Sequence, residues 1–348
     1  MPSSPLTRSA IGAVLLFVIA ILSWEIFLRQ SGSDHGFDDA APLWAHIRGQ
    51  VYEPKEQSTV FIGSSRIKFD LDIPTWHRLT GGDHAVQLAC VGSTPLPVLY
   101  DLAKDVNFNG KLVIDVTEGL FFSTSPGSAD SPDKYIKYYH DLTPAQRASF
   151  VLNRPMESTF VFLDKDNYSI NAMLDKMELK SREGVFMSPI FPRDFDRTDP
   201  FRQSSMKPAF VADTNQHRQV KNIWKFFASR RKGPPISGMP LDSMIHEVKK
   251  ATDRIKSRGG QVVFVRTPSS GTSWEKESQA FPRELYWDKL IAVTQCPGIH
   301  FGDDIATAYY KCPEDSHLSP KDAVAYTKIL LQHLQADAGW RFPKIALH

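Results

Sequence analysis

Five short apolar runs bounded by turn residues alternate with segments of helical periodicity along the chain. The runs are STVFIG (58–63), AVQLAC (85–90), KLVIDV (111–116), QVVFVR (261–266) and GIHFGD (298–303). Continuous apolar runs of this length are typical of strands that are buried on both faces of a parallel sheet. We therefore predict an α/β fold in three layers, with a five-stranded parallel sheet between helices.

Three segments around these runs have the apolar spacing of helices. They cover residues 95–106, 241–258 and 318–335. The last one has a complete start signal, because Ser319 stands at the N-cap, Pro320 at the first helical position and Asp322 at the third. These helices are expected to cover the sheet.

About 140 residues separate the third run from the fourth, far more than a normal crossover between strands needs. The segment contains several helical stretches and a middle part rich in proline and phenylalanine. We predict a large, mostly helical insertion over about residues 123–240, between strands 3 and 4.

The N-terminus carries an apolar stretch at residues 10–28 that only Ser23 and Glu25 interrupt. Its length suffices for a helix that spans a bilayer. Arg8 precedes it and no small-x-small cleavage site follows cleanly, which favours an uncleaved signal anchor over a removed signal peptide. The basic flank favours an N-terminus on the inner side. We expect an anchor at 1–29, a tether and entry segment at 30–55, and a folded domain at 56–348 on the outer side.

Composition excludes several classes of protein. Hydrophobic content of 42% and charged content of 23% are typical of a globular chain. Lys+Arg of 41 against Asp+Glu of 39 leaves almost no net charge, which argues against a nucleic-acid binder. No Cys/His pair has the spacing of zinc ligands, so no metal is expected. No Gly-rich phosphate loop follows the first strand, which argues against a nucleotide binder.

The chain has three cysteines. Cys296 and Cys312 flank the last predicted strand and are a candidate disulfide in an oxidising compartment. Cys90 would then be left over. The alternative is that all three are buried free thiols.

Two polar segments are expected at the same edge of the sheet. The first strand ends at Gly63-Ser64-Ser65-Arg66, and open α/β sheets bind ligands beyond the carboxyl ends of their strands. Pro313-Glu314-Asp315-Ser316-His317 precedes the final helix. A serine nucleophile needs a base within hydrogen-bond reach and an acid that orients this base, and the two segments together contain all three.

The strand-Gly-x-Ser block and the acid-x-His-Leu-Ser block resemble the SGNH (GDSL-type) hydrolase and acyltransferase superfamily. The resemblance covers residues 56–122 and 240–336 and not the insertion. It implies the three-layer, flavodoxin-like SGNH fold, with Ser65 as the nucleophile and His317 as the base. Ser64 stands in the place of the family's aspartate and is the less favoured alternative nucleophile.

The family's oxyanion hole is matched only in part. By resemblance the backbone N–H groups of Ser65 and Gly92 would hold the oxyanion. The third family block supplies an asparagine, and residues 114–122 contain none. Thr117 or Glu118 stands near that place, so the hole is incomplete or built differently.

The acid of the triad has two candidates. The family usually places an aspartate three residues before the histidine, whereas here Glu314 is three before His317 and Asp315 is two before. The shorter spacing resembles membrane-anchored members that acetylate exopolysaccharides, as in alginate O-acetylation. We therefore expect Asp315 to orient His317 and keep Glu314 as the substitute.

The resemblance implies an O-acyltransferase or esterase that acts on cell-envelope or exported polysaccharide through an acyl-enzyme and without a cofactor. It would be anchored in the bacterial inner membrane, with its catalytic domain on the periplasmic side. Its partners would be a glycan acceptor, an acyl donor and a membrane-bound O-acyltransferase. The alternative is a catalytically degenerate SGNH domain that serves as a binding or assembly partner of a membrane complex.

Three further residues at this edge are candidates for substrate binding. Arg66 follows the nucleophile, and Arg266 and Ser269 follow the fourth strand. The alternatives are an ion pair with a nearby carboxylate for Arg66 and a structural turn for Arg266 and Ser269.

Overall fold

The computed structural model describes residues 5–33, 35–54, 56–175, 189–230 and 233–342. The chain forms two compact units. One consists of Met1–Asp38 and Thr143–Ser188, and the other of Asp39–Leu142 and Pro189–His348. Each unit is described by itself.

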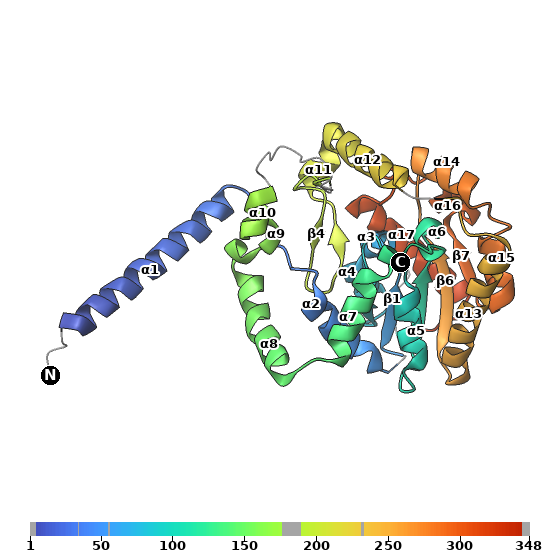
Figure 1. The fold of residues 1–348 in the computed structure, drawn as a ribbon, viewed down its shortest axis with the longest axis horizontal. Helices are drawn as coiled ribbons and strands as arrows, with labels where there is room; N and C mark the ends of the chain where they lie inside the picture. The colour runs from blue at the N-terminus through green and yellow to red at the C-terminus, as the bar shows by residue number, and fades with distance from the viewer. Residues whose placement is uncertain (1–4, 34, 55, 176–188, 231–232, 343–348) are drawn as a thin grey trace. The chain divides into compact units, whose positions relative to one another are not determined.

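The second unit contains the predicted sheet. The strands of this sheet are all parallel and are ordered β2-β1-β3-β6-β7. Figure 1 shows β1, β6 and β7 of this sheet. The strands are β1 Ser58–Ile62, β2 His84–Gln87, β3 Lys111–Asp115, β6 Gln261–Arg266 and β7 Gly298–His300. The prediction of a five-stranded parallel sheet is confirmed, and the strand order is that of flavodoxin-like folds.

Alternate side chains of the strands face two helical layers. Phe61, Val113 and Val263 stand in one row across three strands and belong to the core that also includes apolar residues of the last helix. The helices on this face are α3 (Ser65–Asp70), α4 (Ile73–Leu79) and α17 (Pro320–Ala336). Those of the other layer are α2 (Ala41–Arg48), α5 (Leu96–Lys104), α13 (Gly238–Ser257) and α15 (Trp287–Thr294).

The three predicted helices are present as α5, α13 and α17. At the start of α17 the Ser319 hydroxyl accepts from the backbone N–H of Asp322 at 3.2 Å, as the N-cap signal predicts. Helix α2 lies within the segment expected to be a tether, and its buried residues join it to the sheet unit.

The described residues of the predicted insertion are mostly helical, and the insertion is divided between the units. Residues 143–188 belong to the unit of the N-terminus, and the rest belongs to the unit of the sheet. The sheet unit also contains a two-stranded antiparallel ribbon, β4 with β5, that the sequence did not indicate. Helix α6, Glu118–Phe121, precedes the insertion, whose elements among the described residues are η2 Pro126–Ser128, α7 Asp130–His140, α8 Pro144–Thr159, η3 Val161–Leu163, α9 Lys165–Tyr168, α10 Ile170–Asp175, β4 Arg197–Thr198, β5 Ser204–Ser205, α11 Pro208–Ala212 and α12 Thr214–Ser229.

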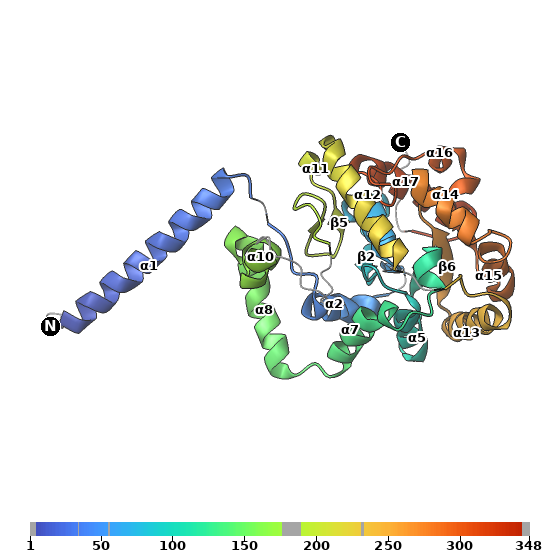
Figure 2. The same ribbon diagram turned by 45° about the horizontal axis from the view of Figure 1, so that its top comes forward.

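Several short elements complete the sheet unit: η1 Gly49–Tyr52, α14 Gly271–Ala280, η4 Phe301–Asp303 and α16 Ile305–Ala308. Helices α12 and α14 lie at the end of the sheet where the strands finish, as both views show (Figures 1 and 2). This is the edge at which the candidate site was expected.

The first unit is organised around α1, Pro5–Gln30, which is long and apolar enough to cross a membrane. Glu25 in its last two turns is buried, and its carboxylate accepts from the backbone N–H groups of Val161 and Phe162 at 3.0 and 3.2 Å. Arg29 donates to the same carboxylate at 2.7 Å. The C-terminal end of α1 is therefore fixed to η3.

The predicted Cys296–Cys312 disulfide is wrong, because all three cysteines are free and buried. Cys312 packs in the core beneath α17. Cys296 follows α15, and its thiol donates to the carbonyl of Thr294 at 3.6 Å on the side of the sheet covered by α13 and α15. The two thiols therefore lie on opposite faces of the sheet.

Candidate active site at the carboxyl edge of the sheet

Gly63 allows β1 to end close against β3. A Cβ at this position would lie 2.6 Å from the Cβ of Asp115 and 2.7 Å from Cγ2 of Ile67, closer than any side chain tolerates. The chain then turns, with Ser64 as the N-cap and Ser65 as the first residue of α3. Backbone N–H groups in a first helical turn have no acceptor within the helix, so that of Ser65 lies at the free end of α3.

Ser65, His317 and Glu314 form one chain of hydrogen bonds. The hydroxyl of Ser65 lies 2.8 Å from Nε2 of His317, and Nδ1 of the same ring lies 2.8 Å from Oε1 of Glu314. A carboxylate only accepts hydrogen bonds, so Nδ1 donates to Glu314, and in the neutral imidazole Nε2 then accepts from the serine. This is the arrangement by which a histidine removes a proton from a serine.

The expectation that Asp315 orients His317 is wrong in geometry, because Glu314 occupies that place. Asp315 has a φ of 75°, in the left-handed region, and this local reversal separates its side chain from that of its neighbour. Its carboxylate pairs instead with Lys221 at 2.8 Å. The backbone N–H of His317 also donates to Oε1 of Glu314, at 2.7 Å. This second hydrogen bond holds the Glu314 carboxylate next to the imidazole.

The environment of Glu314 favours the carboxylate form. Burial alone would raise its pKa, but the charge of His317 and the hydrogen bonds from His317 and Trp224 outweigh burial and lower the pKa below the ordinary value. The indole N–H of Trp224 donates to Oε2 at 2.5 Å. Both oxygens of this buried acid are therefore hydrogen-bonded.

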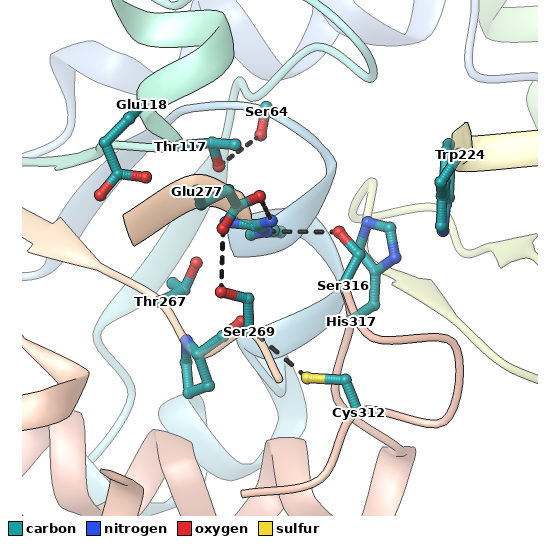
Figure 3. A network of polar contacts seen from close by, with 12 residues as sticks. Ser64, Thr117, Glu118, Trp224, Thr267, Ser269, Glu277, Cys312, Ser316 and His317 are labelled. Carbon is teal, nitrogen blue, oxygen red and sulfur yellow. Dashed lines mark hydrogen bonds and ion pairs between the residues drawn. The ribbon is translucent and has the colours of Figure 1, made fainter. Parts of the chain in front are cut away.

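Aromatic rings surround His317. The centroids of Phe69, Trp224 and Phe195 lie 4.5, 5.8 and 5.9 Å from that of the imidazole. Figure 3 shows the imidazole and the indole on two separate segments, the loop after Cys312 and helix α12. These rings bury the histidine almost completely, at 1% exposure, while Ser65 stays half-buried.

Helix α12 of the insertion contributes two residues that the sequence reading missed. Lys221 and Trp224 are three residues apart on one face of the helix and hold the adjacent carboxylates of Asp315 and Glu314, respectively. In the sequence, α12 is recognisable only as an amphipathic segment that contains a tryptophan. This pattern does not indicate which residue the indole N–H will bind.

The two serines of the turn have different partners. The hydroxyl of Ser64 donates to Oγ1 of Thr117 at 2.9 Å, and Thr117 donates to Asp115 at 3.0 Å. Thr267 donates to the other oxygen of Asp115 at 2.9 Å. The hydroxyl of Ser64 is thus part of a buried hydrogen-bond network, whereas the hydroxyl of Ser65 is hydrogen-bonded to His317.

Gly92 lies in the loop after β2, is exposed, and has a φ of 65° in the left-handed region. The N–H of Cys90 donates to the carbonyl of Gly63 at 3.1 Å, so this loop begins beside the strand end that carries Ser65. Neither Thr117 nor Glu118, which stand where the resemblance would place an asparagine, has a side-chain amide. The hydroxyl of Thr117 is engaged by Asp115, and Glu118 accepts from Arg266 at 2.8 Å.

The three candidate substrate-binding residues meet inside the protein at Glu277 of α14. Arg66 donates to one carboxylate oxygen, and Arg266 and Ser269 donate to the other at 2.6 and 3.0 Å. Figure 3 shows Ser269 turned toward Glu277. Burial alone would raise the pKa of Glu277, but the two guanidinium groups lower it to about 2. The charge of Arg66 is therefore compensated by a carboxylate, the alternative that the sequence had left open.

Helix α3 and the loop of His317 are joined at further points. The backbone N–H of Leu318 donates to Oδ1 of Asp70 at 2.9 Å, and Arg66 Nε donates to Ser316 at 3.3 Å. Asp70 is fully buried, and its Oδ2 has no partner among the described residues. Burial raises the pKa of Asp70 well above its ordinary value, because the Leu318 hydrogen bond compensates only in part.

The chemistry of the site is inferred from its own geometry. Among residues 5–33, 35–54, 56–175, 189–230 and 233–342, no group of three or more His, Cys, Asp or Glu side chains is placed to hold a metal ion. The reacting groups that the site offers are a serine hydroxyl, an imidazole and a carboxylate. A scan against protein-family models finds no match, and a search of curated proteins finds none either.

Proposed function

We propose that the protein is a serine-dependent O-acyltransferase or esterase, tethered to a membrane by α1. The observation that carries the proposal is the hydrogen-bonded chain from Ser65 through His317 to Glu314, with 2.8 Å at each link of the triad. A serine, a base and an orienting acid in this order activate the hydroxyl for attack on an ester.

The reaction proceeds in two stages. His317 Nε2 takes the proton of Ser65 as Oγ attacks the ester carbonyl, and the N–H groups of Ser65 and Gly92 stabilise the oxyanion. His317 then gives the proton to the departing alcohol, which leaves the acyl group on Ser65. In the second stage His317 deprotonates an incoming hydroxyl, which takes the acyl group and restores the serine. A sugar hydroxyl gives acyl transfer, and water gives hydrolysis.

The acceptor follows from the resemblance of the serine and histidine blocks to membrane-anchored SGNH proteins. A glycan of the cell envelope or an exported polysaccharide would supply the hydroxyl. A membrane-bound O-acyltransferase would supply the acyl group. The domain would then work on the extracytoplasmic side of the bacterial inner membrane.

One observation favours a second candidate, a catalytically degenerate domain that binds partners. The hydroxyl of Thr117 donates to Asp115, so that no side chain at this position is available in place of the family's asparagine. The proposed oxyanion hole therefore depends on backbone N–H groups alone, and a labelling experiment separates the two candidates.

The test uses the full chain in detergent and a fluorophosphonate probe, with the labelled residue located by mass spectrometry. We expect label on Ser65, and none in Ser65→Ala or His317→Ala. Ser64→Ala is the matched control and should keep the label, because Ser64 bonds to Thr117 and not to His317. Absence of label from a chain with native near-UV circular dichroism would favour the binding module.

A second measurement follows once Ser65 is labelled. Release of p-nitrophenol from p-nitrophenyl acetate would be compared with and without acetyl-free glycan oligomers. Acceleration together with an acetylated oligomer identifies a transferase. Release that no oligomer affects identifies an esterase.

A further inference from the structure

Helix α8 has its apolar residues on the outside. Ala145, Ala148, Leu152, Pro155 and Met156 follow the i, i+3, i+4 spacing of one helix face, and all are exposed. Val151 flanks this stripe, and Val151 and Leu152 are 63% and 68% exposed. A helix of a water-soluble protein normally turns such a stripe toward its core.

The opposite face of α8 is the one that packs within its unit. Gln146, Phe150, Arg154 and Glu157 lie on this face and are half-buried. Glu157 pairs with Lys165 of α9 at 3.6 Å. The face with three polar residues and Phe150 is therefore turned inward, and the stripe of apolar residues is turned outward.

Helix α10 shows the same inversion. Ile170, Met173 and Leu174 stand at i, i+3 and i+4, and their exposed fractions are 77%, 51% and 47%. The apolar stripe of α8 and these three residues form the "outer apolar face" of the unit. Single exposed apolar residues are ordinary, but an ordered face of this kind marks an interaction surface.

Within the same unit, α8 is fixed to the end of the candidate membrane span. Arg29 in the last turn of α1 donates to the carbonyl of Thr159, the last residue of α8, at 2.7 Å. Glu25, one turn earlier in α1, accepts from the next segment of chain at Val161. The outer apolar face is therefore fixed to the C-terminal end of the candidate membrane span.

We propose that this face lies on a lipid surface, with α8 and α10 set into the headgroup and acyl boundary of the bilayer that α1 crosses. A helix of 16 residues is about 24 Å long, and interfacial helices bury their apolar side roughly 5–10 Å deep. The exposed Arg147 at the flank of the stripe is placed for anionic headgroups. Lipid is favoured over a protein partner because the face belongs to the same compact unit as α1. The inference rests on α1 as a membrane span and not on the proposed chemistry of Ser65.

The test measures how deeply single fluorescent probes lie in the bilayer. The full chain is reconstituted in phosphatidylcholine–phosphatidylglycerol vesicles, with one probe per variant. Leu152→Cys carries an environment-sensitive fluorophore on the stripe, and Asn153→Cys, exposed on the polar side, is the matched control. The native cysteines are buried, which leaves the introduced thiol as the one that maleimide reaches in the folded chain. Ile170→Cys gives an independent probe on α10.

We expect nitroxide-labelled lipid to quench the probes at 152 and 170 several-fold more strongly than the probe at 153. Aqueous iodide should quench in the reverse order. Equal quenching at 152 and 153, or access of iodide to 152, would overturn the proposal and leave the face for a protein partner. A probe at Phe17→Cys that lipid does not quench would also overturn it, because α1 would then lie outside the bilayer. None of these readings depends on labelling of Ser65, so failure here is distinct from failure of the proposed function.

Discussion

The indole N–H of Trp224 donates to Oε2 of Glu314, while Oε1 of the same carboxylate accepts from His317. Trp224 belongs to α12, an element of the insertion, whereas Glu314 and His317 belong to the loop before the final helix. The insertion therefore completes the hydrogen bonding of the buried acid.

Trp224→Phe should weaken the support of Glu314 while keeping an aromatic ring beside His317. Loss of the N–H donor raises the pKa of Glu314, because a hydrogen bond to the carboxylate stabilises its charged form. A hydrogen bond to a charged group contributes about 1.5–3 kcal/mol. We expect the acid limb of the pH profile for Ser65 labelling to move to higher pH.

Lys221→Gln is the control for this change, because Lys221 pairs with Asp315 and not with Glu314. Its pH profile should match that of the wild type. A profile for Trp224→Phe that superimposes on both would show that the indole does not tune the acid.

Glu314→Gln and Asp315→Asn should differ sharply in their effect on acylation. Glu314 accepts from Nδ1 of His317, so the amide disturbs the tautomer that leaves Nε2 free to take the proton. Loss of the orienting acid in a triad costs on the order of 10⁴-fold in rate. Asp315→Asn should cost less than about tenfold. The measurement is the second-order rate of fluorophosphonate labelling, and equal losses in the two variants would contradict the assignment of Glu314.

The sheet was predictable because each strand is a continuous apolar run, a pattern set by burial on both faces. The pair Ser65 and His317 was predictable because both follow strand ends at one edge. The choice between Glu314 and Asp315 was not, because it depends on the left-handed backbone at Asp315, which side-chain spacing does not encode. Trp224 was missed because its partner lies 90 residues away in the sequence. The disulfide failed because proximity in sequence does not say which face of a sheet a thiol occupies.

Gly63→Ala should destabilise the protein by about 1–3 kcal/mol or more, the usual cost of overpacking. The added Cβ would lie 2.6 Å from Cβ of Asp115 in β3 and 2.7 Å from Cγ2 of Ile67 in α3, so that the end of β1 must shift away from both elements. Gly49→Ala is the matched control, because a Cβ there meets nothing within 4 Å and its φ is −63°. Thermal unfolding of the two variants tests this, and equal midpoints would refute the close approach.

Glu277→Gln should lower the free energy of unfolding at neutral pH and flatten its dependence on acid. The carboxylate neutralises Arg66 and Arg266, and removal of one partner from a buried ion pair costs about 3–5 kcal/mol. The pKa of Glu277 is about 2 in the folded chain against an ordinary 4.5. Between these values the unfolded chain binds more protons, so the wild type loses stability as pH falls from 4.5 toward 2.

Urea denaturation at a series of pH values measures this dependence. Glu275→Gln changes an exposed carboxylate two residues earlier in α14 and should retain the acid dependence of the wild type. A Glu277→Gln curve parallel to that of the wild type below pH 4.5 would contradict the prediction.

Asp70→Asn should reduce the loss of folding stability that the wild type shows as pH rises, whereas Glu277→Gln reduces the loss as pH falls. The folded pKa of Asp70 lies well above 3.8, so the folded chain retains a proton that the unfolded chain releases. Stability conferred in acid is therefore lost as pH rises from 3.8 through the folded pKa. The amide oxygen can still accept from Leu318, and the variant should lose less stability than the wild type over this range. Urea denaturation from pH 5 to 9 checks this, and identical slopes for the two chains would rule it out.

The hydrogen bond between Ser65 and His317 joins residues 252 positions apart. At ribosomal speeds of about 5–20 residues per second, roughly 13–50 seconds pass between synthesis of Ser65 and synthesis of His317. A nascent or truncated chain that stops before residue 317 carries the serine without its hydrogen-bond partner. Under the proposed function, order of synthesis thus delays chemistry at this site until nearly all of the polypeptide has been made.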